Sequence, residues 1–342
     1  MTEAIFPVFG PVLVLLGVLP LTAIAAKLLL SAAEAWLPAA WHYTKQELRY
    51  YLVVTASAAP LLWFASAGFH QAETGEPSRV CAVVHTAQEA FCLESWFFAS
   101  ALLLYCVGFA LRRSVARSLT TPKVSSHRSQ AAEQRLQRLA WRHPELEAVV
   151  AQCRVTDDLP VPIATVGLIA PRIVLSTQFV ERLEDEALVG ALHHELQHVR
   201  GRDPLRYFIA AWALRVNPWS RFLLASDITL WKFGRELDCD REAVANGADA
   251  TGIAEAIVAA ARRSLDSAIV ALGDTDGQAL KLRIDLLLAY TEQPPLRTER
   301  RTAFGATIMT AVALTMLPHA GRNWALDVVH VAVETTVLAL TD

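Results

Sequence analysis

The stretch "ALHHELQHVRGRDP", residues 191–204, contains the pattern His-Glu-x-x-His inside an apolar repeat of helical period. Residues four apart on a helix share a face, so His194 and His198 can bind one metal ion together. Glu195 lies one step around the helix, close to such an ion without having to bind it. The alternative is a chance match in an amphipathic helix that carries histidines.

These residue types supply what a metal-dependent hydrolase needs. Two imidazoles can bind zinc and leave coordination positions open. Zinc lowers the pKa of its water to about 7, and a neighbouring carboxylate can take the proton and pass it to the leaving amine. Glu195 is therefore the candidate general base and acid, and Zn²⁺, one ion per chain, is the expected cofactor.

The residue six positions after His198 decides between classes of zinc peptidase. A metzincin has His or Asp there, whereas this chain has Pro204, with Asp203 one residue short. The metzincin layout therefore fails. Asp203 is instead placed to support the end of the helix.

A gluzincin takes its third ligand from a glutamate on a later helix. The segment "GRELDCDREAV", 234–244, offers Glu236, and Asp240 follows four residues on. Glu236 can bind the zinc, and Asp240 can accept the N–H of a ligating histidine and fix its orientation. The alternative is a solvated acidic face paired with Arg235 and Arg241.

The region before the motif predicts a small α+β domain. Residues 131–153 have a helical pattern. Prolines and a glycine then bound two short β-branched runs, 163–166 and 172–175, which indicate a strand pair. Proline cannot donate to a β-ladder, so an edge strand is expected here.

Two further helical segments surround the motif. Acidic residues at 184–186 suit the first turn of a helix that should end near Gly201. The apolar stretch 204–233 predicts two helices broken at Asn217-Pro218. They pack on the membrane face, are partly re-entrant, or are buried in the soluble domain, because apolar pattern does not separate these cases.

The composition indicates a membrane protein. The chain has 342 residues, of which 54% are hydrophobic and 19% charged, whereas soluble domains carry about 25% charge. A membrane-spanning helix needs about 20 apolar residues. A cleaved signal peptide is the alternative for the first run, although no basic residue precedes it. The expected spans are 6–30, 50–69, 91–111 and, shorter, 303–317.

Basic residues near these spans set the expected orientation. They gather after the third span and before the fourth, so the domain 112–302 should be cytoplasmic and the N-terminus outside. The first three spans form region 1–111, and region 303–342 ends in a short amphipathic tail outside. A disulfide between Cys81 and Cys92 can form on the outer side. The net charge of −3 gives no electrostatic case for nucleic-acid binding.

Taken together, the motifs resemble the M56 family of integral-membrane zinc peptidases, the antirepressor family of the β-lactam sensor-transducers. The resemblance covers roughly residues 161–288, and a weaker one runs to the M48 peptidases. Three spans before the domain and one after it also fit. The matching stretches are "VGLIAPRIVLS", "HHELQHVRGRD", "VNPW", "RELDCDREAV" and "LKLRIDLLL".

The resemblance implies a mainly α, multi-pass membrane protein, with about four transmembrane helices and a cytoplasmic gluzincin-type α+β domain. The sensor-transducers carry a large extracellular ligand-binding domain after the fourth span. Only about 25 residues follow Leu317 here, so β-lactam sensing is not expected. The family's H-E-x-x-H-x-x-x-x-D motif matches His194, Glu195, His198 and Asp203. Its E-x-x-C-D motif matches Glu236 and Asp240. The resemblance implies the same site roles for these residues.

We therefore expect a membrane-embedded zinc endopeptidase that cleaves a cytoplasmic protein in a signalling pathway. By resemblance, the substrate is a DNA-binding repressor or the protein's own linker. The substrate backbone would add as a strand along Ile163, Ala164, Thr165 and Val166. Candidates for stabilising the oxyanion are Arg202, Tyr207 and Arg241.

Three alternatives stay open. An M48-like quality-control protease would cleave misfolded membrane proteins broadly. A receptor or scaffold would hold a structural or idle zinc ion, although such a site has no need of Glu195. A transporter is disfavoured, because Glu94 is the clearest acidic residue inside a span and no chain of ionisable residues accompanies it. Besides the substrate and the bilayer, a second copy of the chain is a further candidate partner, which would make the protein a homodimer.

Overall fold

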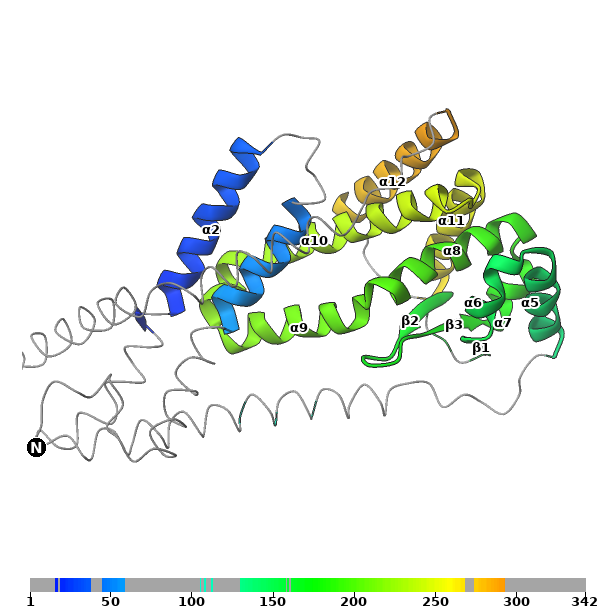
Figure 1. Cartoon of the computed structure of the whole chain (residues 1–342), viewed down its shortest axis with the longest axis horizontal. Coiled ribbons are helices and arrows are strands. Elements are labelled where there is room, and N and C mark those ends of the chain that lie inside the picture. Colours follow the sequence, from blue (N-terminus) through cyan, green and yellow to red (C-terminus); the bar gives the residue numbers. More distant parts are fainter. Residues whose placement is uncertain are drawn as a thin grey trace, which may run out of the picture. The chain divides into compact units, whose positions relative to one another are not determined.

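A computed structural model describes most of the central part of the chain. The described part is mainly helical and contains one small sheet (Figure 1). The chain divides into two compact units, of which the second is Ser114–Ile209 with Thr229–Glu299 and the first is the remainder. The described residues are 16–17, 19–37, 45–58, 130–157, 161–267 and 274–292, with single positions 105, 108, 112 and 159.

The second unit contains a three-stranded sheet in the order β1-β3-β2. Strand β2 (Ile163–Val166) runs antiparallel to β3 (Arg172–Ser176). Both the predicted strand pair and the edge position of the first strand are confirmed. The edge position leaves one side of the β2 backbone without a neighbouring strand in the described sheet.

The third strand, β1 (Cys153–Thr156), was not predicted. It runs parallel to β3 at the end of the segment that the sequence pattern assigned to helix. The helical part of that segment is shorter than predicted, because it comprises α5 (Gln130–Arg142), a 3₁₀ turn at Pro144–Leu146 and α6 (Glu147–Val150). Four residues carry too short a pattern to reveal a strand whose partner lies some twenty residues further on.

The motif helix, α8 (Asp185–Gly201), lies at the centre of the second unit. Its bounds confirm the predicted helix, and the short α7 (Thr177–Arg182) precedes it. Acidic residues occupy its first turn, and Arg202 ends it in the left-handed conformation, with φ of 51°. One apolar core joins α8 to β3 and α5, and its fully buried members include Leu139, Leu146, Ile173, Leu175, Leu188 and Leu192.

Two glycines set the distance between α8 and α11 (Ala250–Ser267). A Cβ atom on Gly190 would lie 2.8 Å from the Ile253 backbone nitrogen, and one on Gly252 would lie 2.7 Å from the Glu186 carbonyl oxygen. Both distances are shorter than real contacts. Backbone therefore packs on backbone here, and this packing fixes where α8 lies.

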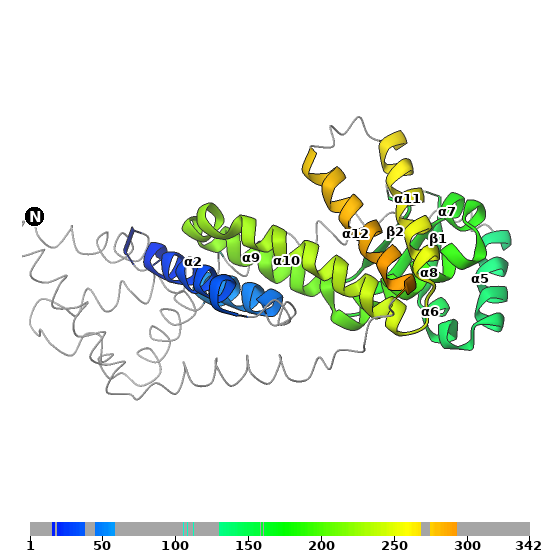
Figure 2. The same cartoon turned by 90° about the horizontal axis from the view of Figure 1, so that it is seen from above.

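The break at Asn217-Pro218 is confirmed. Helix α9 is Asp203–Val216 and α10 is Pro218–Ala245. The Asn217 side-chain oxygen accepts hydrogen bonds from the backbone nitrogens of Trp219 (3.0 Å) and Ser220 (3.2 Å). Asparagine as N-cap with proline at the first helical position is a strong helix start. Figures 1 and 2 show α9 and α10 side by side.

Within the described residues, one helix is long and apolar enough to cross a membrane, α2 (Leu19–Trp36). It extends six residues beyond the predicted end of the first span. The second predicted span begins inside a described helix, 45–58. Nearly all of the third predicted span, all of the fourth and both Cys81 and Cys92 lie outside the described residues. The expected four-helix membrane bundle is therefore not established.

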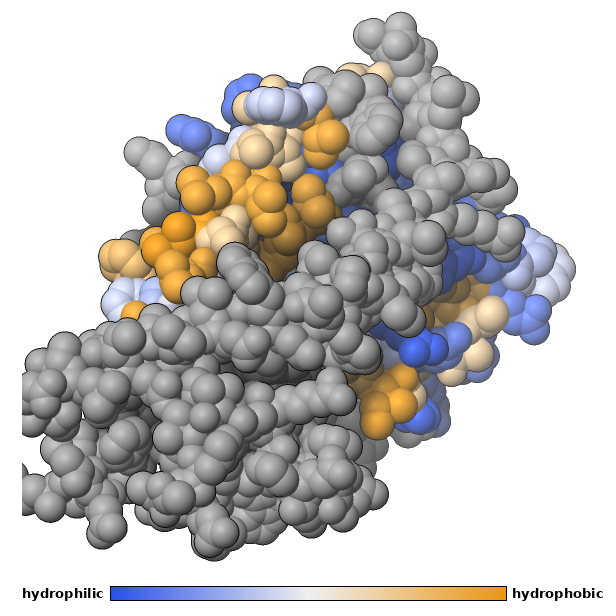
Figure 3. All heavy atoms as spheres, turned by 60° about the vertical axis from the view of Figure 1, so that its left-hand side comes forward, coloured by the Kyte–Doolittle hydropathy of each residue, from blue (hydrophilic) through white to orange (hydrophobic). Residues whose placement is uncertain are grey.

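Polar contacts join α2 to its neighbours in the first unit. The Lys27 ammonium lies 2.7 Å from a carboxylate oxygen of the buried Asp227. The Asn217 side-chain amide donates to the Leu19 carbonyl oxygen at 3.3 Å. The outer face of α2 is apolar, which is typical of a helix in lipid. On the described surface as a whole, hydrophobic side chains gather in one area (Figure 3). The most exposed apolar residues of α2 are Leu21, Ile24, Leu28, Leu29 and Trp36.

Gly190→Ala should destabilise the protein, because the new methyl group must push α11 away from the motif helix. Overpacking of this kind costs about 1–3 kcal/mol, which thermal unfolding of the purified protein would measure. The matched control is Gly277→Ala on α12 (Asp274–Glu292), where an added Cβ meets nothing within 4 Å. The control should be neutral or stabilising by up to about 1 kcal/mol. Equal unfolding temperatures for the two variants would contradict the close-packing argument.

Candidate metal centre

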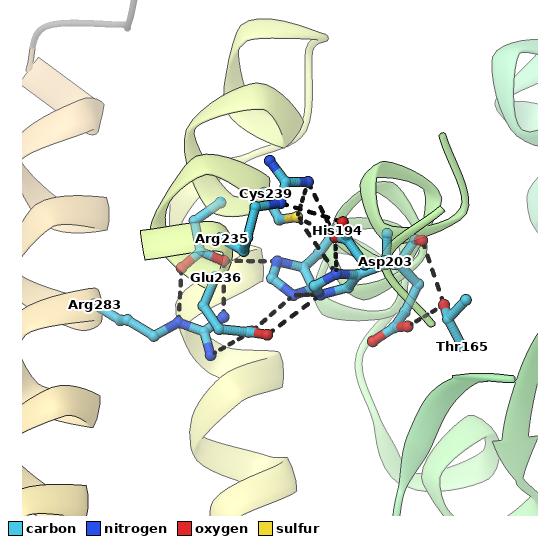
Figure 4. A network of polar contacts seen from close by, with 10 residues as sticks. Thr165, His194, Asp203, Arg235, Glu236, Cys239 and Arg283 are labelled. Carbon is cyan, nitrogen blue, oxygen red and sulfur yellow. Dashed lines mark hydrogen bonds and ion pairs between the residues drawn. The ribbon is translucent and has the colours of Figure 1, made fainter. Parts of the chain in front are cut away.

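Three potential ligand side chains from two helices face one another in the second unit. The Nε2 atoms of His194 and His198, both on α8, lie 3.1 Å apart. Glu236 on α10 faces both rings, with Oε2 3.4 Å from His194 Nε2 and Oε1 3.6 Å from His198 Nε2. Figure 4 shows His194 between Glu236 of α10 and Thr165.

The geometry of these donors suits a zinc ion. Ligand atoms about 2.0–2.2 Å from a tetrahedral zinc lie about 3.3–3.6 Å from one another. The separations of 3.4 and 3.6 Å, each to a different Glu236 oxygen, are of that size, and the separation of 3.1 Å between the two Nε2 atoms is slightly shorter. Two imidazole nitrogens and one carboxylate oxygen are also ligands that zinc accepts. His194, His198 and Glu236 therefore fit the metal that the sequence implies.

An aspartate and an arginine support the first histidine. His194 Nδ1 lies 2.7 Å from Asp240 Oδ1. Arg283 of α12 donates to the same carboxylate through Nε (2.8 Å) and Nη2 (2.9 Å). A carboxylate on Nδ1 orients the ring and directs Nε2 toward the metal position.

The second histidine has the same kind of support. His198 Nδ1 lies 2.8 Å from Asp203 Oδ2. Arg235 donates to that carboxylate through Nε (3.2 Å) and Nη2 (3.0 Å), and both side chains are fully buried. The site therefore contains two chains of contacts, each running from arginine through aspartate to histidine.

These contacts shift the protonation equilibria of the groups. Burial alone would lower the pKa of His194, but the carboxylates of Asp240 and, to a smaller extent, Glu236 outweigh it and raise the pKa to about 10. Burial would raise the pKa of Asp240, yet His194 and Arg283 hold it below its usual value. The pKa of Asp203 is lowered likewise by His198 and Arg235, against the effect of burial. Both aspartates therefore stay ionised at neutral pH.

The candidate base lies beside the histidines. Its carboxylate oxygen and the ligand atoms of His194 and His198 lie within 4.8 Å of one another. Thr165 of β2 donates a hydrogen bond of 2.6 Å to Glu195 Oε2. One carboxylate oxygen is thus held by the edge strand, and Glu195 lies between the candidate substrate strand and the metal position.

A second cluster, His198, Asp203 and Cys239, also has potential metal ligands in proximity. It already holds a cation, because Arg235 Nη2 lies 3.0 Å from Asp203 and 3.6 Å from the Cys239 sulfur. Burial raises the pKa of the Cys239 thiol well above its usual value. A neutral thiol beside a guanidinium is a poor metal ligand, so this cluster is a weaker candidate for a metal ion than His194, His198 and Glu236.

The three oxyanion candidates have different surroundings. Arg202 is exposed at the C-terminus of α8, and Arg241 donates to Asp238 at 3.2 Å. The Tyr207 hydroxyl is buried, and no hydrogen-bond partner for it is found in the described part of the chain. Its ring packs edge-to-face on Trp231, with centroids 5.4 Å apart. Tyr207 is therefore the candidate with an available donor.

Sequence reasoning did not find the roles of three residues. Arg235 was interpreted only as a surface partner of the acidic face, Arg283 was not singled out, and Thr165 was considered only as part of the substrate strand. Spacing along the chain marks residues that share one helix face. It does not mark a contact that a distant helix or strand supplies.

Comparison with known families agrees with this geometry. The family model described as BlaR1 peptidase M56 matches residues 21–287, which include nearly all of α2, all of α8 and α10, and α12 as far as Leu287. No curated protein and no solved structure matches the chain.

Zinc binding should release a proton from His194. Its pKa of about 10 keeps it protonated at pH 7 in the metal-free protein, and a metal ligand must be deprotonated. Apparent zinc affinity should fall about tenfold per pH unit of acidification for each proton displaced. Calorimetry in two buffers of different ionisation enthalpy counts the protons. Asp240→Asn removes the main cause of the raised pKa, so it should release fewer protons, and equal release would contradict the assignment.

The same shift predicts the sign of a stability change in the metal-free protein. A raised pKa stabilises the fold while the group is protonated in both states. The contribution of His194 should therefore be fully present below about pH 6.5 and lost as pH rises through about 10. Asp240→Asn should flatten this part of the stability profile.

Proposed function

The chain belongs to the M56 family of membrane-associated metallopeptidases, and from this premise we propose that it is a zinc-dependent endopeptidase acting on a protein at the cytoplasmic side of the membrane. The observation that carries the proposal is the division of labour among the acidic residues. Asp203 and Asp240 orient the histidines, and Glu236 faces both rings. Glu195 takes no part in orienting either ring and is held by Thr165 instead.

The proposed roles follow from these contacts. His194, His198 and Glu236 would hold the zinc ion, which supplies a Lewis acid and a water molecule of lowered pKa when bound. Glu195 would accept the proton of that water at its carboxylate and then deliver it to the leaving amine nitrogen. The Tyr207 hydroxyl is the proposed donor to the oxyanion.

Strand β2 is the proposed binding surface for the substrate backbone. In the described sheet it pairs with β3 on one side only, and all of its residues are half-buried. An extended peptide can add to such an edge through main-chain hydrogen bonds. Because Thr165 contacts Glu195, a peptide along β2 would run beside the base.

The family suggests the kind of substrate. We propose that the substrate is a DNA-binding repressor or the chain's own linker, and that it is cleaved in response to a signal. The enzyme itself would be a multi-pass protein of the cell membrane whose N-terminus lies outside. The exposed apolar residues on α2 support the membrane placement. A homodimer is compatible with this proposal.

Glu195→Gln should abolish cleavage and keep the metal. The amide preserves shape but cannot accept the proton, so the rate should fall by at least about 10²-fold. Zinc content should stay near one ion per chain, because the ligands are intact. The control is Glu186→Gln, an exposed residue of the same helix. Cleavage by Glu195→Gln at the rate of the control would overturn the assigned mechanism.

The same variant identifies the substrate in cells. Peptide termini present with the wild type and missing with Glu195→Gln report cleavage sites. A single site in a DNA-binding protein or in the chain itself supports the proposal, whereas many sites in membrane proteins would indicate quality control instead.

Thr165→Val should lower the turnover number, because valine keeps the shape of threonine but cannot donate to Glu195. Hydrogen bonds to charged groups contribute about 1.5–3 kcal/mol, which corresponds to about a 10- to 100-fold loss. Thr165→Ser keeps the hydroxyl and should restore most of the activity. Steady-state kinetics on the cleaved substrate would test this, and equal rates for the valine and serine variants would argue that the strand, not the hydroxyl, matters.

A further inference from the structure

Arg283 of α12 contacts two carboxylates of the candidate metal centre at once. Its Nε and Nη2 atoms lie 2.8 and 2.9 Å from the two oxygens of Asp240, and Nη1 lies 3.1 Å from Glu236 Oε2 (Figure 4). The Arg283 side chain is only 16% exposed. A paired, planar contact of this kind fixes the orientation of a carboxylate as well as its position.

The two carboxylates need a cation between them. Glu236 and Asp240 lie one turn apart on α10, and like charges at this spacing repel each other. Their repulsion is stronger in partly buried surroundings than in water. The guanidinium offsets this repulsion, so that Asp240 can stay against His194 Nδ1 while Glu236 faces the Nε2 atoms of both histidines.

The position of Arg283 depends on the packing of α12. Leu287, one turn further along this helix, is fully buried in an apolar cluster with Ala243 and Ile253, and Tyr290 packs against the same cluster. This cluster holds the Arg283 face of α12 toward α10. The other supporting arginine, Arg235, lies on α10 itself, so its support of Asp203 does not require α12.

From these contacts we infer that Arg283 is a positioning residue of the metal centre, which holds the third ligand Glu236 and the orienting Asp240 in their working geometry. The inference rests on the proposed peptidase function. Arg283 acts through the two carboxylates and not on the reacting atoms. Helix α12 is then part of the metal centre, although it supplies no ligand.

The test compares Arg283→Gln and Arg283→Lys in the full chain with Lys281→Gln as the matched control. Lys281 lies on the same helix, is exposed, and pairs only with Asp285 among the described contacts. Zinc affinity is measured by competition with a chelator, and the visible absorption of the cobalt-substituted protein reports ligand geometry. Cleavage kinetics separate kcat from KM.

Arg283→Gln should bind zinc about 10- to 100-fold more weakly, as expected for loss of a supporting contact. Its cobalt spectrum should change, and kcat should fall while KM stays within about twofold. Lysine keeps the charge but cannot make the paired contact, so Arg283→Lys should be intermediate. Lys281→Gln should match the wild type in every measurement.

Two results would overturn the inference. One is unchanged zinc affinity and cobalt spectrum in both Arg283 variants with a raised KM, since Arg283 would then bind substrate directly. The other is a lowered unfolding temperature with unchanged zinc affinity, which indicates a purely structural contact. Arg283→Lys provides the same readouts if the glutamine variant does not fold. If the wild type binds zinc but cleaves nothing, the proposed function fails, while the affinities still decide the role of Arg283.

Discussion

The Asp203 carboxylate is the point on which the site is built. Asp203 is the first residue of α9. Its carboxylate contacts His198 at the end of α8 and is paired with Arg235 of α10, so one buried group joins three helices. The chain makes room for it, because a Cβ atom on Gly201 would lie 2.8 Å from both the Arg235 guanidinium and Asp203 Oδ1. Removing one partner of such a buried pair leaves the other charge uncompensated and lowers the free energy of unfolding by about 3–5 kcal/mol. The turn between α8 and α9 and the orientation of His198 therefore depend on each other.

A divalent cation would balance the charges around the histidines. Four carboxylates and two guanidinium groups leave two negative charges uncompensated when both histidines are neutral. Without a metal ion, the raised pKa of His194 offsets part of this negative charge, because it keeps a proton close to where the ion would bind. Buried, uncompensated charge is costly, so the same arrangement that holds a proton on His194 also favours a bound cation. The carboxylates are Glu195, Asp203, Glu236 and Asp240, and the cations are Arg235 and Arg283.

Local sequence patterns predicted the features that one helix or one turn determines. The bounds of α8, the break at Asn217-Pro218 and the β2–β3 pair are confirmed because period, caps and prolines are short-range signals. The spacing of four residues between His194 and His198 on α8, and between Glu236 and Asp240 on α10, identified the candidate site residues. The structure brings these residues together. Contacts between distant segments carry no such signal. The parallel pairing of β1, the hydroxyl of Thr165 beside Glu195 and the reach of Arg283 from α12 all depend on tertiary packing.

The open edge of β2 restricts what the proposed enzyme can cut. A chain that adds to an edge strand must offer several consecutive residues with their backbone groups free, and a folded domain has few such segments. Helices and paired strands would be excluded by their own hydrogen bonds, whatever their side chains. Selectivity would then come less from a recognised motif than from where a partner is locally unfolded. A substrate of two folded parts would be severed in its connecting segment, and both parts would leave intact.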